Sequence, residues 1–124
     1  MESRISGHTK LYCLIGSPVG HSGSPAMYNY SFARTGVDAA YLAFDIPLEQ
    51  TQAAVDALKL LNVGGFNVTM PDKTAVASIV DELSPAARLI GAANTVTVDE
   101  DGKLTGHNTD GIGFVRNLHE NGVE

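Results

Sequence analysis

The stretch LYCLIGSPVGHSGSP, residues 11–25, decides the fold. Leu11 to Ile15 is a short, mostly apolar run, which is typical of a buried strand, and Gly16-Ser17-Pro18 ends it. Ser24-Pro25 then predicts the start of a helix, with Ser24 as its N-cap and proline at the first helical position. Gly36 is placed to end that helix. A buried strand joined to a helix by a loop of small and hydroxylated residues favours an α/β domain.

The apolar pattern alternates between the strand period and the helix period along the rest of the chain. Further strands are expected at residues 40–46, 66–69, 94–98 and 104–107. One helix face is expected to carry Ala54, Val55, Leu58 and Leu61, and a second to carry Val76, Ile79, Val80 and Leu83. Ser84-Pro85 predicts a short helix towards Leu89, Asp101-Gly102 predicts a hairpin between the last two strands, and a final helix is expected over residues 110–121. The predicted fold class is α/β, with a mixed, mostly parallel sheet flanked by helices.

Composition limits the classes of partner. The chain has 124 residues, which suits one domain. Its formal net charge is −6 with 8 lysine and arginine residues, so a nucleic-acid partner is not expected. Cys13 is the single cysteine, so the chain can form no intrachain disulfide and lacks the cysteine spacing of a zinc site. We therefore expect a cytoplasmic protein without a metal. No run approaches the roughly 20 apolar residues of a membrane span, and the polar segment 1–10 lacks a signal-peptide core, so no membrane association is expected.

Polar side chains gather where the predicted strands end, which is where open α/β sheets place their ligands. His21-Ser22-Gly23-Ser24-Pro25 places two hydroxyls beside a helix N-terminus, where both can donate hydrogen bonds to a carboxylate. The alternative is that Ser24 only caps the helix and that Ser22 and His21 are loop residues.

Three further clusters follow later strands. In Asn67-Val68-Thr69-Met70-Pro71-Asp72-Lys73, alternation puts Asn67 and Thr69 on one face, and Pro71 breaks the strand so that Lys73 projects from the next loop or helix start. A lysine there is electrostatically unfavourable, which indicates a function, although most lysines are solvated surface groups. Gly91-Ala92-Ala93-Asn94-Thr95 and Gly106-His107-Asn108-Thr109-Asp110-Gly111 place amides and an acid beside small residues, and each alone also fits a turn or a capped helix start.

These clusters, in this order and spacing, resemble the motifs of the shikimate dehydrogenase family. The resemblance runs from about Leu11 to Phe114. Tyr41-Leu42-Ala43-Phe44 and the segment 81–87 look more like the quinate/shikimate branch of the family. The sequence departs from the commonest family pattern at Gly23, Tyr28 and Asp72, and Asp72 adds a negative charge next to Lys73.

The resemblance implies that residues 1–110 are the substrate-binding domain of a two-domain dehydrogenase and that residues 111–124 begin the domain-connecting helix. A Rossmann domain for NADP or NAD is expected to be absent from this chain, since no G-x-G-x-x-G follows a strand in it, so no cofactor-binding residue is assigned and the chain alone is expected to be inactive. The implied enzyme is an oxidoreductase that interconverts shikimate and 3-dehydroshikimate in aromatic amino-acid biosynthesis, with quinate and 3-dehydroquinate as a further substrate pair.

By the same resemblance, Lys73 and Asp110 form the catalytic acid/base pair. Further residues are expected to bind the substrate: Ser22 and Ser24 its carboxylate, Thr69 and Asn94 its ring hydroxyls, with Asn67, Asn108 and Thr109 as additional contacts. This mixture of donors and acceptors suits a hydroxylated acid better than a phosphorylated one.

Two other functions stay open at this point. One is a stand-alone module that binds or senses a hydroxy acid without catalysis. The other is a hydrolase with Ser22 or Ser24 as nucleophile and His21 as base, which the adjacent positions and the lack of a G-x-S-x-G motif disfavour. A homodimer is also left open.

Overall fold

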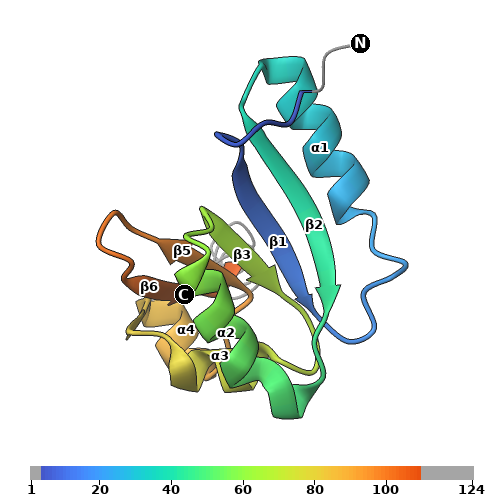
Figure 1. The fold of residues 1–124 in the computed structure, drawn as a ribbon. Coiled ribbons are helices and arrows are strands. Elements are labelled where there is room, and N and C mark those ends of the chain that lie inside the picture. The colour runs from blue at the N-terminus through green and yellow to red at the C-terminus, as the bar shows by residue number, and fades with distance from the viewer. Residues whose placement is uncertain (1–3, 110–124) are drawn as a thin grey trace, which may run out of the picture.

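The computed structural model describes residues 4–109, which form a six-stranded sheet with its helices (Figure 1). The elements follow in the order β1 (Lys10–Gly16), α1 (Ser24–Thr35), β2 (Ala39–Asp45), a short 3-10 helix (Leu48–Gln50), α2 (Thr51–Leu60), β3 (Gly65–Val68), α3 (Lys73–Ile79), β4 (Glu82–Leu83), α4 (Pro85–Ile90), β5 (Thr95–Val98) and β6 (Leu104–His107). The helix predicted over residues 110–121 lies outside the described residues, as does Asp110.

The sheet is mixed, as the sequence predicts. Its strand order is β2-β1-β3-β5-β6-β4. Strand β1 runs parallel to both β2 and β3, and β4 runs parallel to β6. The hairpin β5–β6 enters antiparallel to β3, around the turn that Asp101-Gly102 predicts. The α/β fold class and most of the predicted elements are therefore confirmed.

Helices cover the two faces of the sheet unequally. Cys13, Ile15, Phe66 and Val68 point to one face, where they form the main core with α2 and α3. On the other face Leu14 and Tyr41 pack against Tyr28 and Phe32 of α1, which lies beside β1 and β2 at one edge of the sheet (Figure 1). Leu14 pairs with Asn67, and Asn67 pairs with Thr95, so these three residues form a row across the α1 face of the sheet.

Two sequence predictions were wrong in detail. The helix expected to reach Leu83 ends at Ile79, because Val80 is extended and β4 pairs with β6. Asp81 reinforces this pairing: its N–H donates to the Leu104 carbonyl at 3.0 Å and its Oδ2 accepts from the Leu104 N–H at 2.8 Å. Sheet pairing at long range thus overrides the helical period. The second error concerns Ser24, which is the first residue of α1 rather than its N-cap. Gly23 is the N-cap residue, and no side chain caps the helix there.

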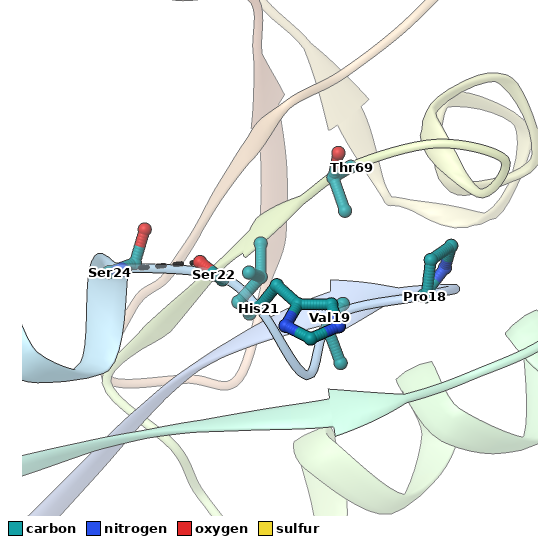
Figure 2. Close-up of a pocket in the computed structure, with 7 residues that line it drawn as sticks. Pro18, Val19, His21, Ser22, Ser24 and Thr69 are labelled. Carbon is teal, nitrogen blue, oxygen red and sulfur yellow. Dashed lines mark hydrogen bonds between the residues drawn. The ribbon is translucent and has the colours of Figure 1, made fainter.

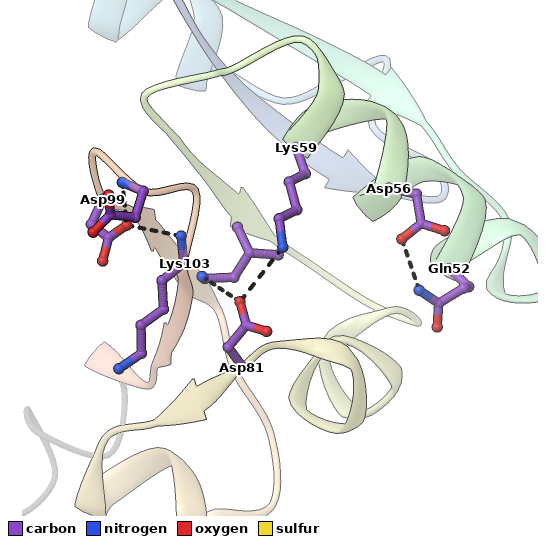
Figure 3. A network of polar contacts seen from close by, with 8 residues as sticks. Gln52, Asp56, Lys59, Asp81, Asp99 and Lys103 are labelled. Carbon is purple, nitrogen blue, oxygen red and sulfur yellow. Dashed lines mark hydrogen bonds and ion pairs between the residues drawn. The ribbon is translucent and has the colours of Figure 1, made fainter.

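Two ion pairs lie around the outer strands of the sheet, and Figure 3 shows the one between Lys59 and Asp81. The Lys59 ammonium of α2 lies 3.9 Å from the Asp81 carboxylate, and Lys103 lies 2.9 Å from Glu82. All four side chains are about half exposed, so these ion pairs contribute little to stability. Among the described residues no helix has the length and apolar character that crossing a bilayer requires.

Candidate functional site

A cavity of about 390 Å³ opens where β1 and β3 end (Figure 2). Its lining combines an apolar floor with hydroxyl groups and one imidazole, and consists of Leu14, Pro18, Val19, His21, Ser22, Ser24 and Thr69. The loop between β1 and α1 supplies most of these residues, and Thr69 follows β3 directly. The structure therefore brings together three of the predicted substrate-binding residues: Ser22, Ser24 and Thr69.

The loop after β3 is held against the end of β1. The Thr69 N–H donates to the Ile15 carbonyl at 2.9 Å, and the Ser17 N–H donates to the Met70 carbonyl at 3.0 Å. Gly16 makes this approach possible, since a Cβ there would lie 2.3 Å from Thr69 Cγ2. The glycine that ends β1 thus allows the loop after β3 to place Thr69 at the cavity.

The two serines lie at the start of α1 with hydroxyl protons to donate. Ser22 Oγ accepts the backbone N–H of Ser24 at 3.2 Å, which leaves the Ser22 hydroxyl proton for a ligand. Within residues 4–109 the Ser24 side chain makes no capping bond, so its hydroxyl is also available. Both lie beside the N-terminus of a 12-residue helix, whose unpaired N–H groups and dipole favour an anion. This corner of the cavity is suited to a carboxylate.

His21, for which the sequence left open a place in the loop or a role as the base of a hydrolase, is a cavity residue. Its exposed ring lines the cavity beside Ser22 (Figure 2). In the described part of the chain no hydrogen bond joins this ring to either serine, so the nucleophile–base pair of a hydrolase is not formed there. Its position next to Ser22 in the sequence was the available signal for a binding role.

A second group of polar side chains lies on the α1 face of the sheet, beyond the part that α1 covers. Asn67 Nδ2 donates to Thr95 Oγ1 at 3.2 Å, and Thr95 Oγ1 donates to Asn94 Oδ1 at 3.1 Å. Asn94 Nδ2 donates to Thr109 Oγ1 at 2.9 Å, and the Tyr41 hydroxyl donates to Asn67 Oδ1 at 2.8 Å. Asn67, Asn94 and Thr109 were predicted, whereas the roles of Thr95 and Tyr41 were missed.

The remaining predicted residues are Asn108, Lys73 and Asp110. Asn108 is 4% exposed and its amide donates to the Ala92 carbonyl at 3.0 Å, a placement that favours support of the backbone. Lys73 is half-buried at the first position of α3, and its carbonyl accepts from the Ala93 N–H at 3.1 Å. Asp110 lies outside the described residues.

Asp72, which precedes Lys73, is fully buried. Neither of its carboxylate oxygens has a hydrogen-bond partner in the described part of the chain. Burial raises the pKa of this carboxyl, and the nearby negative charges of Asp45 and Glu49 raise it further. The Thr51 hydroxyl acts in the opposite direction on this pKa, but its proton is donated to the Leu48 carbonyl at 2.8 Å. A buried acid therefore lies next in sequence to the predicted catalytic lysine.

The sequence lacks a dinucleotide-binding motif, and the described residues lack a cluster of metal ligands. The sequence contains no G-x-G-x-x-G motif to hold a pyrophosphate. Residues 4–109 contain no group of three His, Cys, Asp or Glu side chains placed to hold a metal ion. The thiol of Cys13 is buried, and burial raises its pKa to about 12, so this cysteine is an unreactive core residue.

Comparison with known proteins identifies the family. The model of the shikimate dehydrogenase substrate binding domain matches residues 14–96. The chain is 52% identical to the shikimate dehydrogenase (NADP(+)) of Streptococcus uberis and 50% identical to that of Alkaliphilus metalliredigens, covering 42% and 43% of these proteins and nearly all of itself. It superposes with a TM-score of 0.88 on a shikimate 5-dehydrogenase from Listeria monocytogenes solved in complex with shikimate and NAD, at 47% identity over 100% of this chain and 43% of that one. The chain thus spans less than half the length of these relatives, and it belongs to the shikimate dehydrogenase substrate-binding domain family.

Proposed function

We propose that this chain holds shikimate while an NADP- or NAD-dependent dehydrogenase interconverts it with 3-dehydroshikimate. The observation that carries the proposal is the cavity in which the Ser22 and Ser24 hydroxyls meet the N-terminus of α1, with Thr69 and the row of amides beside it. One end of such a site suits a carboxylate and the other suits ring hydroxyls. Shikimate carries both kinds of group on one small ring.

The carboxylate is proposed to lie against the serines. Ser22 and Ser24 each donate a hydroxyl proton to it, and the partial positive charge of the α1 N-terminus favours it further. His21 lies at the same end of the cavity and offers an additional donor. Leu14 and Val19 provide an apolar floor against the carbon ring.

The ring hydroxyls are proposed to meet Thr69, Asn94 and Asn67. A hydroxyl both donates and accepts, so a threonine hydroxyl and amide groups are suitable partners for it. Thr109 and Asn108 are proposed to support this side of the site, Thr109 by bonding the Asn94 amide and Asn108 by holding the backbone at Ala92.

Proton transfer is proposed to involve Lys73 and Asp110. The nicotinamide, when bound, accepts or supplies the hydride, and we assign its binding to a Rossmann domain reached through a connecting helix that begins after residue 110. As the ring hydroxyl is oxidised to a carbonyl, its proton must pass to a nearby base, and in reduction an acid must return it. The start of α3 places Lys73 four residues beyond the cavity residue Thr69, which is the basis for giving it this role.

Three finer assignments complete the proposal. Quinate is included as a second substrate, because it carries a carboxylate and ring hydroxyls as shikimate does. A homodimer is proposed through the sheet edge at β2, where Leu42 is 50% and Phe44 is 36% exposed. We assign the protein to the cytoplasm because its single cysteine is a buried free thiol.

Calorimetric titration of this chain with shikimate tests the proposal. Ser22→Ala and Ser24→Ala should each raise the Kd about 10- to 100-fold, since each loses a hydrogen bond to a charged group. Ser31→Ala, at an exposed position of α1, is the matched control and should leave the Kd unchanged. No binding to the unsubstituted chain, or an unchanged Kd in both cavity variants, would contradict the proposed site. Joining the chain to a nucleotide-binding domain should add NADP-dependent oxidation of shikimate, and its absence would favour a binding or sensor module.

A further inference from the structure

A series of side-chain hydrogen bonds runs from Tyr41 on the edge strand β2 to the two amides of the proposed site. The Tyr41 hydroxyl lies 2.8 Å from Asn67 Oδ1, and Asn67 Nδ2 lies 3.2 Å from Thr95 Oγ1. Thr95 Oγ1 lies 3.1 Å from Asn94 Oδ1. At the far end, the Thr109 backbone N–H lies 3.1 Å from the same Asn94 oxygen. We call this series the Tyr41 chain.

The direction of every bond in the Tyr41 chain follows from its far end. A backbone N–H can only donate, so the contact with Thr109 fixes Asn94 Oδ1 as an acceptor. The Thr95 hydroxyl must then give its proton to that oxygen and accept from Asn67 Nδ2. This leaves Asn67 Oδ1 facing Tyr41, whose hydroxyl is the donor. Burial raises the pKa of the Tyr41 phenol, so the hydroxyl keeps the proton that it donates.

Tyr41 itself is held rigidly by helix α1. Its side chain is 2% exposed, and its ring stacks on Tyr28 with centroids 4.5 Å apart and planes inclined by 20°. The Asn29 side chain bonds both the N–H and the carbonyl of Tyr41 at 2.8 Å. Tyr28 and Asn29 belong to the helix that begins at Ser24. Tyr41 is therefore fixed to α1 by its backbone and to Asn67 by its phenol.

We propose that Tyr41 is a positioning residue: its hydroxyl holds the Asn67 amide in the orientation that Thr109 fixes through Asn94 and Thr95, so that Asn67 presents an N–H donor to a substrate hydroxyl. This inference rests on the proposed function. Each amide nitrogen carries two protons, and the described bonds use one of them. Asn67 Nδ2 donates to Thr95, and Asn94 Nδ2 donates to Thr109. The second proton of each amide is left for a ligand. Without the Tyr41 hydroxyl, Asn67 Oδ1 loses its donor and the Asn67 amide is held by Thr95 alone.

The test compares two ligands that differ in their hydroxyls. Tyr41→Phe keeps the ring, its burial and its stack on Tyr28, and removes only the hydroxyl. It should raise the Kd for shikimate about 3- to 10-fold, the effect of one neutral hydrogen bond. It should leave unchanged the Kd for cyclohex-1-ene-1-carboxylate, which has the same ring acid and no hydroxyls. Tyr30→Phe, at a 65% exposed tyrosine of α1, is the matched control and should alter neither value.

Variants of Thr95 test the chain independently of Tyr41. Thr95→Val interrupts the chain and should reproduce the effect of Tyr41→Phe, whereas Thr95→Ser keeps the hydroxyl and should retain the affinity for shikimate. The double variant Tyr41→Phe/Thr95→Val should raise the shikimate Kd by less than the product of the two single increases, because both residues act on one network. An unchanged shikimate Kd in Tyr41→Phe, or equal weakening of both ligands, would overturn the positioning role and leave the proposed function standing. Failure of the unsubstituted chain to bind shikimate would overturn the proposed function itself.

Discussion

The buried carboxyl of Asp72 makes the stability of this chain depend on pH in a predictable direction. Asp72→Asn replaces the acid by a neutral amide of nearly the same shape. Because burial raises the pKa of Asp72 above its ordinary value of 3.8, the folded chain holds a proton that the unfolded chain releases. The free energy of unfolding of the unsubstituted chain should therefore fall as pH rises from about 3.8 to the raised pKa, and then level off.

The size of the effect follows from the surroundings of the carboxylate. Neither oxygen has a hydrogen-bond partner among the described residues, and the nearby Asp45 and Glu49 are also negative. A buried polar group without partners costs about 1–3 kcal/mol, and a charged one more. Asp72→Asn should thus raise the free energy of unfolding by at least about 1 kcal/mol at pH 8, which corresponds to roughly 4 °C in Tm for a domain of this size.

Urea unfolding followed by circular dichroism at pH 4 and pH 8 measures this effect. The two chains should be nearly equal in stability at pH 4, and the variant should be the more stable at pH 8. Asp56→Asn is the control, since Asp56 is exposed on α2, and it should show no such divergence. A variant that is less stable than the unsubstituted chain at pH 8, or a difference that does not change with pH, would mean that the carboxylate has a stabilising partner and would refute the reasoning.

Three further predictions concern the proposed site. Ser22→Ala should lower the free energy of unfolding by about 1 kcal/mol because Ser22 bonds the first N–H of α1, whereas Ser24→Ala should leave the Tm nearly unchanged; thermal melts that show the reverse order would restore Ser24 as the cap. Gly16→Ala should displace Thr69 and cost about 1–3 kcal/mol together with shikimate affinity, so a variant of full stability and affinity in melting and titration would contradict the close approach. In a chimera of this chain with the remainder of the Streptococcus uberis relative, Lys73→Ala should lower kcat about 10²–10⁴-fold with a much smaller change in KM, and Asp110→Asn should behave alike. If steady-state kinetics show only a raised KM, Lys73 is a binding group.

Much of the fold could be predicted from local patterns in the sequence. Three signals act over only a few residues: the apolar run at 11–15, the helix-ending Gly36 and the Asp101-Gly102 turn. The structure confirms the elements that they predict. The end of α3 could not be predicted in this way. Leu83 continues the helical period, but the strand pairing of β4 with β6 depends on residues more than 20 positions later in the sequence.

The candidate site was likewise only partly predictable from the sequence. Ser22, Ser24 and Thr69 were recognisable from the motifs that carry the family resemblance, and the cavity brings them together. The link from Tyr41 to Asn67 was not recognisable, because it depends on how β2, β1 and β3 lie side by side in the sheet. The burial of Asp72 could not be predicted from the sequence either, because aspartate residues normally lie at the surface.

A crystal structure of this chain bound to shikimate would test the central claim most directly. The account predicts that the carboxylate oxygens lie within hydrogen-bonding distance, about 2.6–3.2 Å, of Ser22 Oγ and Ser24 Oγ, with the ring hydroxyls directed towards Thr69 and Asn94. Shikimate bound outside this cavity, or bound in it with the carboxylate turned towards Asn94, would contradict the account.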